Sequence, residues 1–386
     1  MSDKLKILVL NYEYPPIGGG GGIISKYISE GLAKNGHQVT VLTTWFKNLL
    51  EKENNNDLTI IRLKSKRKND FRSNPVEMLS WISHSKQFLK KHCKKNQYDI
   101  CIANFAVPGG NVAKYILKKF NIPYVIISHG HDIPWVKPVS LYFFHFLNYF
   151  KIKSICKRSL ANFIQTAEMK VNIDRFCKES NKNIVILNGF DKNMFYPNYE
   201  KREKELKILF VGRLVKQKDP LTLLKAIKIF SDKHEDFTLN ILGDGPLRKK
   251  MKKFIADNNL KNNVKILGKI PYNKMIEEYQ SAHVLIAPSI SEGMSISIIE
   301  ALACGLYVAT TKASGNNELI NSNNNGKLVN FGDYEQIAKT LEKYYNEKFL
   351  NQFTVPKNII NEFNKKYNWK NIIKKYDEKL KQIVLK

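Results

Sequence analysis

The sequence predicts an α/β fold of two domains, each a doubly wound parallel sheet covered by helices on both faces. The chain has 386 residues, which exceeds one ordinary domain and is enough for two cores. Short apolar runs alternate with helical stretches along both halves, which is the signature of a parallel sheet. The composition, 43% hydrophobic and 25% charged, is that of a soluble globular protein, and no apolar stretch approaches the roughly 18 residues of a spanning helix.

The first half contains seven expected strands with helical stretches between them. After the first strand comes the glycine-rich segment YPPIGGGGG, followed by an expected helix at 23–34. Glycines between a strand and a helix let backbone amides approach an anion, next to the positive end of the helix. Five consecutive glycines satisfy many patterns, so a flexible loop is the alternative. The expected strands are 6–11, 38–43, 58–63, 100–104, 124–128, 162–166 and 184–187.

The second half repeats this plan. We expect the domain boundary within residues 193–207, where Pro197, Asn198 and the charged run EKREKELK break the apolar pattern. The first domain is therefore placed at 1–195 and the second at 205–367. A last helix at 368–386 has apolar residues spaced four, three, four and three apart on one face. The expected strands are 206–211, 237–242, 264–267, 284–287 and 306–310, with helices near 221–233, 246–258, 273–282 and 295–304.

Two carboxylates, Glu292 and Glu300, stand eight positions apart in the segment APSISEGMSISIIEALACGLYVATT. A strand ends just before this segment and a helix is expected at 295–304, so Glu292 lies in the loop and Glu300 on the helix. Ligands of an open parallel sheet bind at the carboxyl ends of its strands, where this loop must lie. Both carboxylates can thus face one ligand, although solvated surface charges are the alternative.

Three further segments follow predicted strands. Arg213 and Lys218 occur in FVGRLVKQKDP, where two cations beside a helix N-terminus can hold a pyrophosphate, unless they are solvated surface charges. The turn LGDGP, which contains Gly243, follows the next strand. In the first half, SHGHD places His129 at the edge of the crevice, where a strand-end histidine can also simply bond the backbone.

These segments together resemble glycosyltransferase family 4, the retaining GT-B enzymes also called glycosyl transferases group 1. Glu292 and Glu300 match its E-x7-E motif, Tyr-Pro-Pro before the glycines resembles its first motif, and Asn188-Gly-Phe-Asp resembles its N-G-x-D segment. The resemblance covers nearly the whole chain. It implies a GT-B fold of two Rossmann-like domains facing across a cleft. The first domain would bind the acceptor, the second would bind the donor, and the last helix would return to the first domain.

The resemblance also implies roles for residues. Glu300 would bond the ribose, Glu292 the donor-sugar hydroxyls, and His129 the donor sugar near its reacting carbon, while Arg213 and Lys218 would hold the diphosphate. This chain has Gly293, Met294 and Ser295 where many members have Pro-Phe-Gly. The implied catalytic residues are His129, Arg213, Lys218 and Glu292; the donor-binding residues are Gly19, Gly20, Arg213, Lys218, Gly243, Glu292, Gly293, Met294, Ser295, Ile296 and Glu300; and the acceptor-side residues are Tyr14, Gly18 and Asn188.

The expected reaction is metal-independent, retaining transfer of a sugar from a nucleotide diphosphate. The resemblance favours a UDP-sugar as the donor, because members of the family commonly use one. It also implies a saccharide or lipid-linked acceptor of surface polysaccharide or glycolipid synthesis. No D-x-D, H-E-x-x-H or Walker P-loop occurs in the sequence, so we expect no metal and no cofactor. The alternative is a nucleotide-sugar-modifying or dinucleotide-dependent enzyme on a similar two-domain plan. In a dinucleotide-binding domain, an acidic residue near the end of the second strand binds a ribose. This chain has Thr43-Thr44-Trp45 at that position.

The net charge of +28 implies anionic partners or a biased genome. Lys and Arg outnumber Asp and Glu by 30 to 15 in residues 1–200 and by 33 to 20 in the remainder, and this even spread argues against nucleic-acid binding. Five cysteines without a C-x-x-C are typical of free thiols in a cytoplasmic protein. The basic stretch 61–100 and the aromatic run LYFFHFLNYF suit the face of an anionic membrane, while a solvated loop and a core helix are the alternative.

Overall fold

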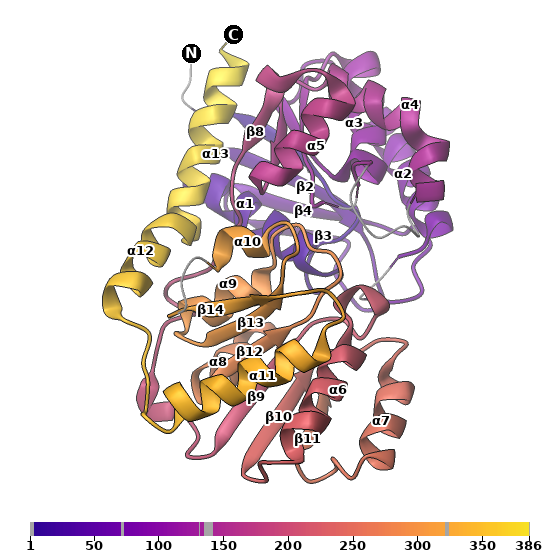
Figure 1. Ribbon diagram of the computed structural model, residues 1–386. Coiled ribbons are helices and arrows are strands. Elements are labelled where there is room, and N and C mark those ends of the chain that lie inside the picture. Colours follow the sequence, from indigo (N-terminus) through magenta and orange to yellow (C-terminus); the bar gives the residue numbers. More distant parts are fainter. Residues whose placement is uncertain (1–3, 71–72, 131, 135–141, 321–323, 386) are drawn as a thin grey trace. The chain divides into compact units, whose positions relative to one another are not determined.

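The computed structural model describes residues 4–70, 73–130, 132–134, 142–320 and 324–385. The chain divides into two compact units, which are Met1–Asn188 with Trp369–Lys386 and Gly189–Asn368 (Figure 1). We call them unit 1 and unit 2. Each unit has its own apolar core and its own sheet. The predicted α/β fold with two Rossmann-like domains is confirmed.

Unit 1 contains an eight-stranded sheet in the order β3-β4-β2-β1-β5-β6-β7-β8. Every neighbouring pair is parallel except β3 and β4. The strands are β1 (Lys6–Leu10), β2 (Gln38–Thr44), β3 (Lys52–Asn55), β4 (Leu58–Leu63), β5 (Ile100–Asn104), β6 (Tyr124–Ile127), β7 (Asn162–Ile164) and β8 (Asn183–Val185). The described helices are α1 (Gly20–Lys34), α2 (Pro75–His92), α3 (Gly110–Phe120), α4 (Tyr142–Arg158), α5 (Ala167–Cys177) and α13 (Trp369–Val384), with the short turns η1 (Phe105–Gly109) and η3 (Ser180–Lys182).

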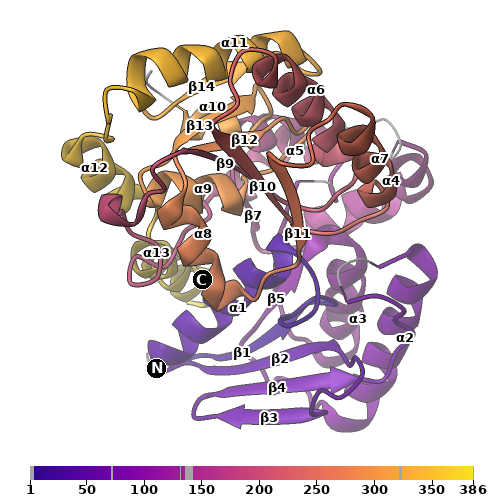
Figure 2. The ribbon, with the colours of Figure 1, turned by 90° about the horizontal axis from the view of Figure 1, so that it is seen from below.

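Unit 2 contains a six-stranded parallel sheet in the order β11-β10-β9-β12-β13-β14. Figures 1 and 2 show α6 and α11 on one face of this sheet and α8 and α9 on the other, so it is doubly wound. The strands are β9 (Leu206–Val211), β10 (Phe237–Leu242), β11 (Val264–Gly268), β12 (Val284–Ala287), β13 (Tyr307–Thr311) and β14 (Gly326–Val329). The described helices are α6 (Pro220–Ser231), α7 (Arg248–Asp257), α8 (Met275–Ser281), α9 (Ile296–Ala303), α10 (Asn316–Leu319), α11 (Tyr334–Tyr344) and α12 (Lys357–Tyr367), with the short turns η4 (Tyr199–Lys201), η5 (Lys216–Lys218), η6 (Tyr272–Lys274) and η7 (Tyr345–Phe349).

Local sequence explains these elements. The central strands β1 and β5 are almost continuously buried, as expected for parallel strands that are covered on both faces. Helix α2 begins with a capping box, in which Glu77 N donates to Asn74 Oδ1 at 3.0 Å and Asn74 N donates to Glu77 Oε2 at 3.2 Å. Pro75 occupies its first turn, where a missing N–H costs nothing.

Two edge strands were not predicted. Strand β3 has the sequence KENN, which contains no apolar residue. Its backbone pairs with β4, and most of its side chains face solvent. Charged and amide side chains on such an edge discourage pairing with another chain. Strand β14 has four residues, GKLV, and follows an asparagine-rich stretch that gives no strand pattern. Pattern reasoning detects buried strands, and these edges are not fully buried.

The boundary between the units lies earlier than predicted. Unit 2 begins at Gly189, whereas the sequence placed residues up to 195 in the first domain. Phe190 explains the difference, because its N–H donates to Tyr367 O at 2.9 Å and its ring stacks on Phe363 with the centroids 5.9 Å apart. The turn residues of 193–207 therefore follow the start of unit 2 and do not mark its border.

The last helix returns to unit 1, as predicted. In α13, Trp369 stacks on Tyr27 of α1 with ring centroids 5.1 Å apart. A Cβ atom on Gly31 would lie 2.0 Å from Cδ1 of Ile373, so glycine at this position lets α1 and α13 approach closely. The five cysteines are free and buried. Within the described residues, every helix is too short or too polar to cross a membrane.

Candidate functional site

The loop after β9 carries the two predicted cations of unit 2. Arg213 is exposed, and its Nη2 donates to Gln217 Oε1 at 3.5 Å. Lys218 lies in η5, just before α6, and its ammonium forms an ion pair with the carboxylate of Glu292. The two side chains are only 16% and 9% exposed, so this pair is largely shielded from water. The structure thus brings together Lys218, which is predicted to bind the diphosphate, and Glu292, which is predicted to bind the donor sugar.

Glycine packs the neighbouring loop against this one. Gly243 follows β10 with φ +140°, and a Cβ atom there would lie 1.9 Å from Gly212 O. Leu214 N donates to Asp244 O at 3.0 Å, which joins the loop after β9 to the loop after β10. The backbone at position 243 requires glycine, because any side chain would separate the two loops.

The segment from Glu292 to Ile296 follows β12 and leads into α9, as predicted. Gln217 fixes its entry, because Ile290 N donates to Gln217 O at 2.8 Å and Gln217 Nε2 donates to Ser291 O at 2.9 Å. A Cβ atom on Gly315 would lie 1.9 Å from Gly293 O, so the loop after β13 packs directly on this segment. The predicted residues of this segment that are buried are Glu292, Gly293, Met294 and Ser295.

Glu300 is buried on α9 between two tyrosines that sequence reasoning did not identify. The Tyr272 hydroxyl donates to Glu300 Oε1 at 2.6 Å, and the Tyr279 hydroxyl donates to Glu300 Oε2 at 2.9 Å. Burial raises the pKa of Glu300 to about 7, and the two hydrogen bonds partly oppose this rise. The carboxylate predicted to bind a ribose is therefore oriented in advance by a fixed pair of donors.

In unit 1, His129 follows β6 and forms a hydrogen bond with Asn104 at the end of β5. The distance from His129 Nε2 to Asn104 Oδ1 is 3.0 Å, and Asn104 Nδ2 donates to Ser25 Oγ at 3.3 Å. Because an amide oxygen only accepts, Nε2 carries the hydrogen and Nδ1 is an acceptor. Among the described residues, this buried Nδ1 has no hydrogen-bond partner. Burial lowers the pKa of His129 to about 4, against the opposing charge of Asp132, so the ring is neutral.

Asp132 holds the loop that presents His129. Its Oδ1 accepts from Ser128 Oγ at 2.8 Å and from His129 N at 3.0 Å, while its Oδ2 accepts from Ala106 N at 2.8 Å. The ring of Phe105 lies against the imidazole, with centroids 4.5 Å apart. The backbone around His129 is thus fixed by one buried carboxylate.

The glycine loop of unit 1 contains an internal anion that sequence reasoning missed. Glu13 Oε2 accepts from Gly19 N at 3.2 Å, and Arg67 Nη2 lies 3.8 Å from Glu13 Oε1. Gly18 N donates to Asp70 O at 2.6 Å, and α1 begins at Gly20. The amide of Gly19, which we expected to approach a ligand anion, is therefore already bonded to a carboxylate of the chain.

Two predicted acceptor-side residues are deeply buried. Tyr14 and Asn188 are each 2% exposed. The Tyr14 hydroxyl has no partner among the described residues, and burial raises the pKa of Tyr14. Glu300, which we keep as a proposed ligand, is 3% exposed, so burial alone does not decide whether a side chain meets a ligand. The acceptor-side roles of Tyr14 and Asn188 stay predictions from the family resemblance.

Two protein-family models match this chain. The model described as Glycosyltransferase Family 4 matches residues 18–193, and the model described as Glycosyl transferases group 1 matches residues 191–366. The chain is also 28% identical over 305 residues to UDP-Gal:alpha-D-GlcNAc-diphosphoundecaprenol alpha-1,3-galactosyltransferase of Escherichia coli. That similarity covers 75% of this chain and 76% of the relative.

Solved structures share the fold at low sequence identity. Sucrose-phosphate synthase from Thermosynechococcus elongatus is 19% identical, with a TM-score of 0.85 over 98% of this chain and 99% of the other. Anabaena HepE in complex with UDP-glucose is 19% identical, with a TM-score of 0.77 over 98% of this chain and 100% of the other. The chain thus shares its α/β fold with these solved proteins.

Proposed function

Because this chain belongs to the glycosyl transferases group 1 of glycosyltransferase family 4, we propose that it transfers a sugar, with retention of configuration, from a nucleotide diphosphate donor to a saccharide or lipid-linked acceptor. The observation that carries this proposal is the shielded ion pair of Lys218 and Glu292. The loop that carries Glu292 leads into α9, the helix that carries Glu300. The proposed diphosphate-binding residue Lys218 and the proposed donor-binding residues Glu292 and Glu300 all belong to unit 2.

Donor binding follows from these side chains. Within the described part of the chain, the Arg213 guanidinium makes one long hydrogen bond, to a neutral amide, so it can add a bidentate contact to a diphosphate. Lys218 already lies in a shielded place, where its attraction to an anion is stronger than in open water. As the diphosphate approaches Lys218, the carboxylate of Glu292 becomes available to sugar hydroxyls.

The proposed reaction requires no protein nucleophile. The bond from the anomeric carbon to the leaving diphosphate oxygen breaks, and a bond to the acceptor oxygen forms on the same face. The acceptor proton passes to the leaving diphosphate, whose growing charge Arg213 and Lys218 stabilise. Glu292 and Glu300 orient the donor and take no proton in this scheme. A neutral His129 accepts a hydrogen bond from a ligand hydroxyl through Nδ1.

The relatives support the choice of donor and acceptor class. The E. coli relative is named as a UDP-galactose enzyme acting on a diphosphoundecaprenol-linked sugar, and HepE was solved with UDP-glucose. We therefore propose a UDP-sugar as donor and a saccharide or lipid-linked saccharide of surface polysaccharide or glycolipid synthesis as acceptor. We also propose that Arg213, Lys218 and backbone amides replace a metal ion. Among the described residues, no three His, Cys, Asp or Glu side chains are grouped to hold one.

A screen of ligands tests the donor. We expect UDP-sugars to raise the melting temperature more than GDP- or ADP-sugars do. Lys218→Ala should reduce this shift, whereas Lys250→Ala, at an exposed position on α7, should leave it unchanged. Stabilisation by NAD or NADP with no response to any nucleotide sugar would favour the dinucleotide-dependent alternative.

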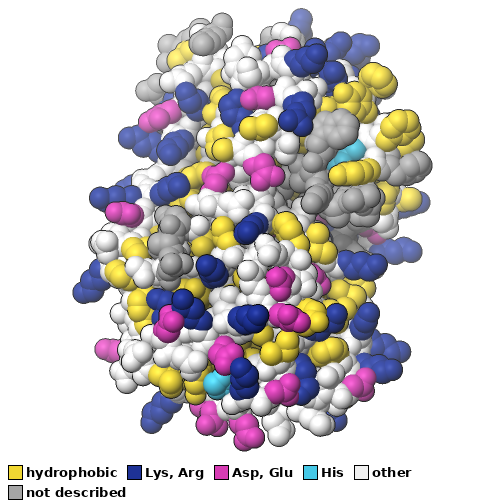
Figure 3. Space-filling model, in the orientation of Figure 1, with side chains coloured by type: hydrophobic (Ala, Val, Ile, Leu, Met, Phe, Trp, Pro, Cys, Tyr) yellow, Lys and Arg dark blue, Asp and Glu magenta, His cyan; other side chains and the backbone are white. Residues whose placement is uncertain are grey.

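We further propose that unit 1 attaches to an anionic membrane through α4. Phe146, Leu147 and Phe150 are 78%, 64% and 83% exposed, and Figure 3 shows hydrophobic side chains gathered over α4. Burial lowers the pKa of Lys151, and the nearby charges of Lys86 and Lys114 add to this effect. Exposed aromatic residues beside clustered cations suit the boundary of an anionic bilayer.

One part of the predicted basic surface does not contribute. Arg67 is buried, and it donates to the backbone oxygens of Tyr12, Asn69 and Asp70. Arg62 is buried as well and pairs with Glu53. These two cations hold the loops of unit 1, so they are not part of the membrane surface. Arg72 lies outside the described residues.

Vesicle binding tests the membrane proposal. The protein should sediment with vesicles that contain phosphatidylglycerol at low salt, and not with phosphatidylcholine alone. A triple variant with serine at Phe146, Leu147 and Phe150 should lose this binding. A control with serine at Leu267 and Leu350, which are exposed residues of unit 2, should keep it. Equal binding by the triple variant would place the contact elsewhere.

A further inference from the structure

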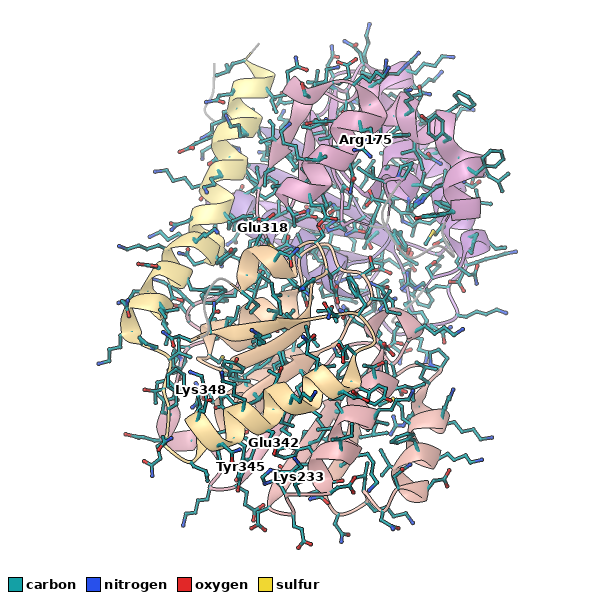
Figure 4. All side chains as sticks on the ribbon, viewed as in Figure 1. Arg175, Lys233, Glu318, Glu342, Tyr345 and Lys348 are labelled. Atoms are coloured by element: carbon teal, nitrogen blue, oxygen red, sulfur yellow. The ribbon has the colours of Figure 1, made fainter. Side chains whose placement is uncertain are left out.

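Unit 2 has a cavity of about 340 Å³ that the proposed reaction does not use. Four of its lining residues are lysines, Lys327 on β14, Lys339 and Lys343 on α11, and Lys348 in η7. Figure 4 labels Lys348 beside the C-terminal end of α11. Glu347 is the one carboxylate in the lining. We call this cavity the lysine pocket.

The lysine pocket and the proposed donor residues lie at opposite ends of the strands of the unit 2 sheet. Its lining includes Tyr307, which is the first residue of β13, and Lys327, near the start of β14. All strands of this sheet are parallel, so the pocket lies beside their amino ends. Arg213 and Glu292 follow the carboxyl ends of β9 and β12. A ligand in the lysine pocket is therefore not the donor in its proposed site.

The cations of the pocket are poorly neutralised by the protein. Among the described residues, neither Lys327 nor Lys339 forms an ion pair. Lys343 pairs with Glu347 at 3.7 Å, but both side chains are more than half exposed, and such a pair contributes little. On the neighbouring surface, by contrast, Lys233 pairs with Glu342 at 2.9 Å.

Lys348 is held inward by aromatic rings. Its ammonium lies 3.6 Å from the ring centroid of Phe353 and 5.7 Å from that of Tyr307, which are cation–π distances. Burial and the charge of Lys343 lower the pKa of Lys348, against the opposing charge of Glu347. The protein thus keeps like charges near one another, and an anion between them would relieve their repulsion.

The walls of the pocket leave the ammonium groups as its main free donors. The Thr340 hydroxyl donates to Gln336 O at 2.7 Å, and Gln336 Oε1 accepts from Asn330 N at 2.6 Å. Tyr307 and Tyr344 lie with ring centroids 4.9 Å apart, and burial raises the pKa of each to about 12, so both are neutral. A volume of this size admits a small molecule and no folded partner.

We propose that the lysine pocket binds a small phosphomonoester, with Lys327, Lys339 and Lys348 around the phosphate and the organic part against the tyrosines. Lysine binds phosphate as a point charge, without the fixed geometry that arginine imposes. Several lysines in the lining of one cavity therefore suit a phosphate that is presented by a compact organic group. This proposal stands on unit 2 alone and does not depend on the transferase reaction.

Calorimetry with glucose 6-phosphate, inorganic phosphate and glucose tests this site. We expect wild-type protein to bind glucose 6-phosphate and not glucose. Lys327→Gln combined with Lys339→Gln should weaken binding at least tenfold. The matched control is Lys252→Gln with Lys253→Gln, which removes the same charge from exposed positions on α7 and should bind as wild type. Both tested lysines are exposed, so their replacement spares the core.

Each outcome decides a point. Binding of inorganic phosphate as tight as that of glucose 6-phosphate supports the site and identifies free phosphate as a sufficient ligand. Retained binding in Lys218→Ala, with weakened donor response, separates the lysine pocket from the donor site. The proposal is overturned if wild type binds neither phosphate compound, or if the pocket variant and the α7 control lose affinity equally.

Discussion

His129 illustrates how neighbouring groups decide the chemistry of one side chain. Asn104 sets its tautomer and burial lowers its pKa to about 4, so the ring is neutral across the physiological range. Burial also lowers the pKa of His283 to about 4, with Arg202 adding to the effect. Neither ring is available as a positively charged donor at pH 7.

These two histidines predict how stability depends on pH. Because their pKa values are lower in the folded chain than the ordinary 6.5, the unfolded chain takes up protons first as pH falls. The free energy of unfolding should therefore be unaffected by them above pH 6.5. It should fall between pH 6.5 and 4, by up to about 3 kcal/mol for each ring. Urea unfolding at several pH values, with His283→Gln as a comparison, measures this slope, and a flat profile would contradict it.

Substitution of Glu300 and of Glu292 should impair different steps of the proposed reaction. Glu300→Gln should weaken binding of free UDP, because Glu300 is the proposed ribose ligand. Glu292→Gln should lower turnover with a smaller loss of UDP affinity, because Glu292 is the proposed sugar ligand. Calorimetry with UDP and steady-state kinetics separate the two effects. Equal loss of UDP affinity in both variants would merge the two roles.

Sequence reasoning located these side chains but not their partners. Glu292, Glu300 and His129 follow predicted strands, and the end of a parallel strand is where a ligand binds. Tyr272 and Asn104 bond to residues 28 and 25 positions away, and this pairing depends on tertiary packing that no local pattern encodes. Glu13 was missed for a different reason. Its bond to Gly19 spans six residues, but it depends on the fold of the glycine loop, and the motif gave no indication of an internal anion.

At the scale of elements, helix α13 depends on one glycine of α1. Gly31→Ala would improve helix propensity by about 1 kcal/mol but would place a methyl group 2.0 Å from Ile373 Cδ1. Because overpacking costs typically 1–3 kcal/mol, we expect the variant to be less stable. Thermal unfolding measures the loss.

A double-mutant cycle identifies the cause. Ile373→Ala removes the colliding atoms, so Gly31→Ala should cost less in that background than in wild type. Equal costs in both backgrounds would mean that α1 and α13 do not press together here. The pattern of α13 was readable from sequence because its apolar residues recur at helical spacing. Its destination in unit 1 came only from the family resemblance.

At the scale of the whole molecule, each of the two units keeps its own sheet and core. The alternation of strands and helices was enough to predict this plan. The border between the units was predicted less well, because Phe190 already belongs to unit 2, before the turn residues of 193–207. The large positive charge is divided among different structural roles. Some cations hold loops, some face the proposed membrane surface, and four line the lysine pocket.

The central claim is retaining sugar transfer without a metal, and proton NMR of the donor reaction tests it most directly. The protein is incubated with a UDP-α-sugar in the presence of EDTA, and the anomeric proton is followed from donor to first product. The account predicts release of UDP and initial formation of the α anomer, with little reaction in Glu300→Gln. Initial formation of the β anomer, or donor consumption that requires added manganese, would contradict it.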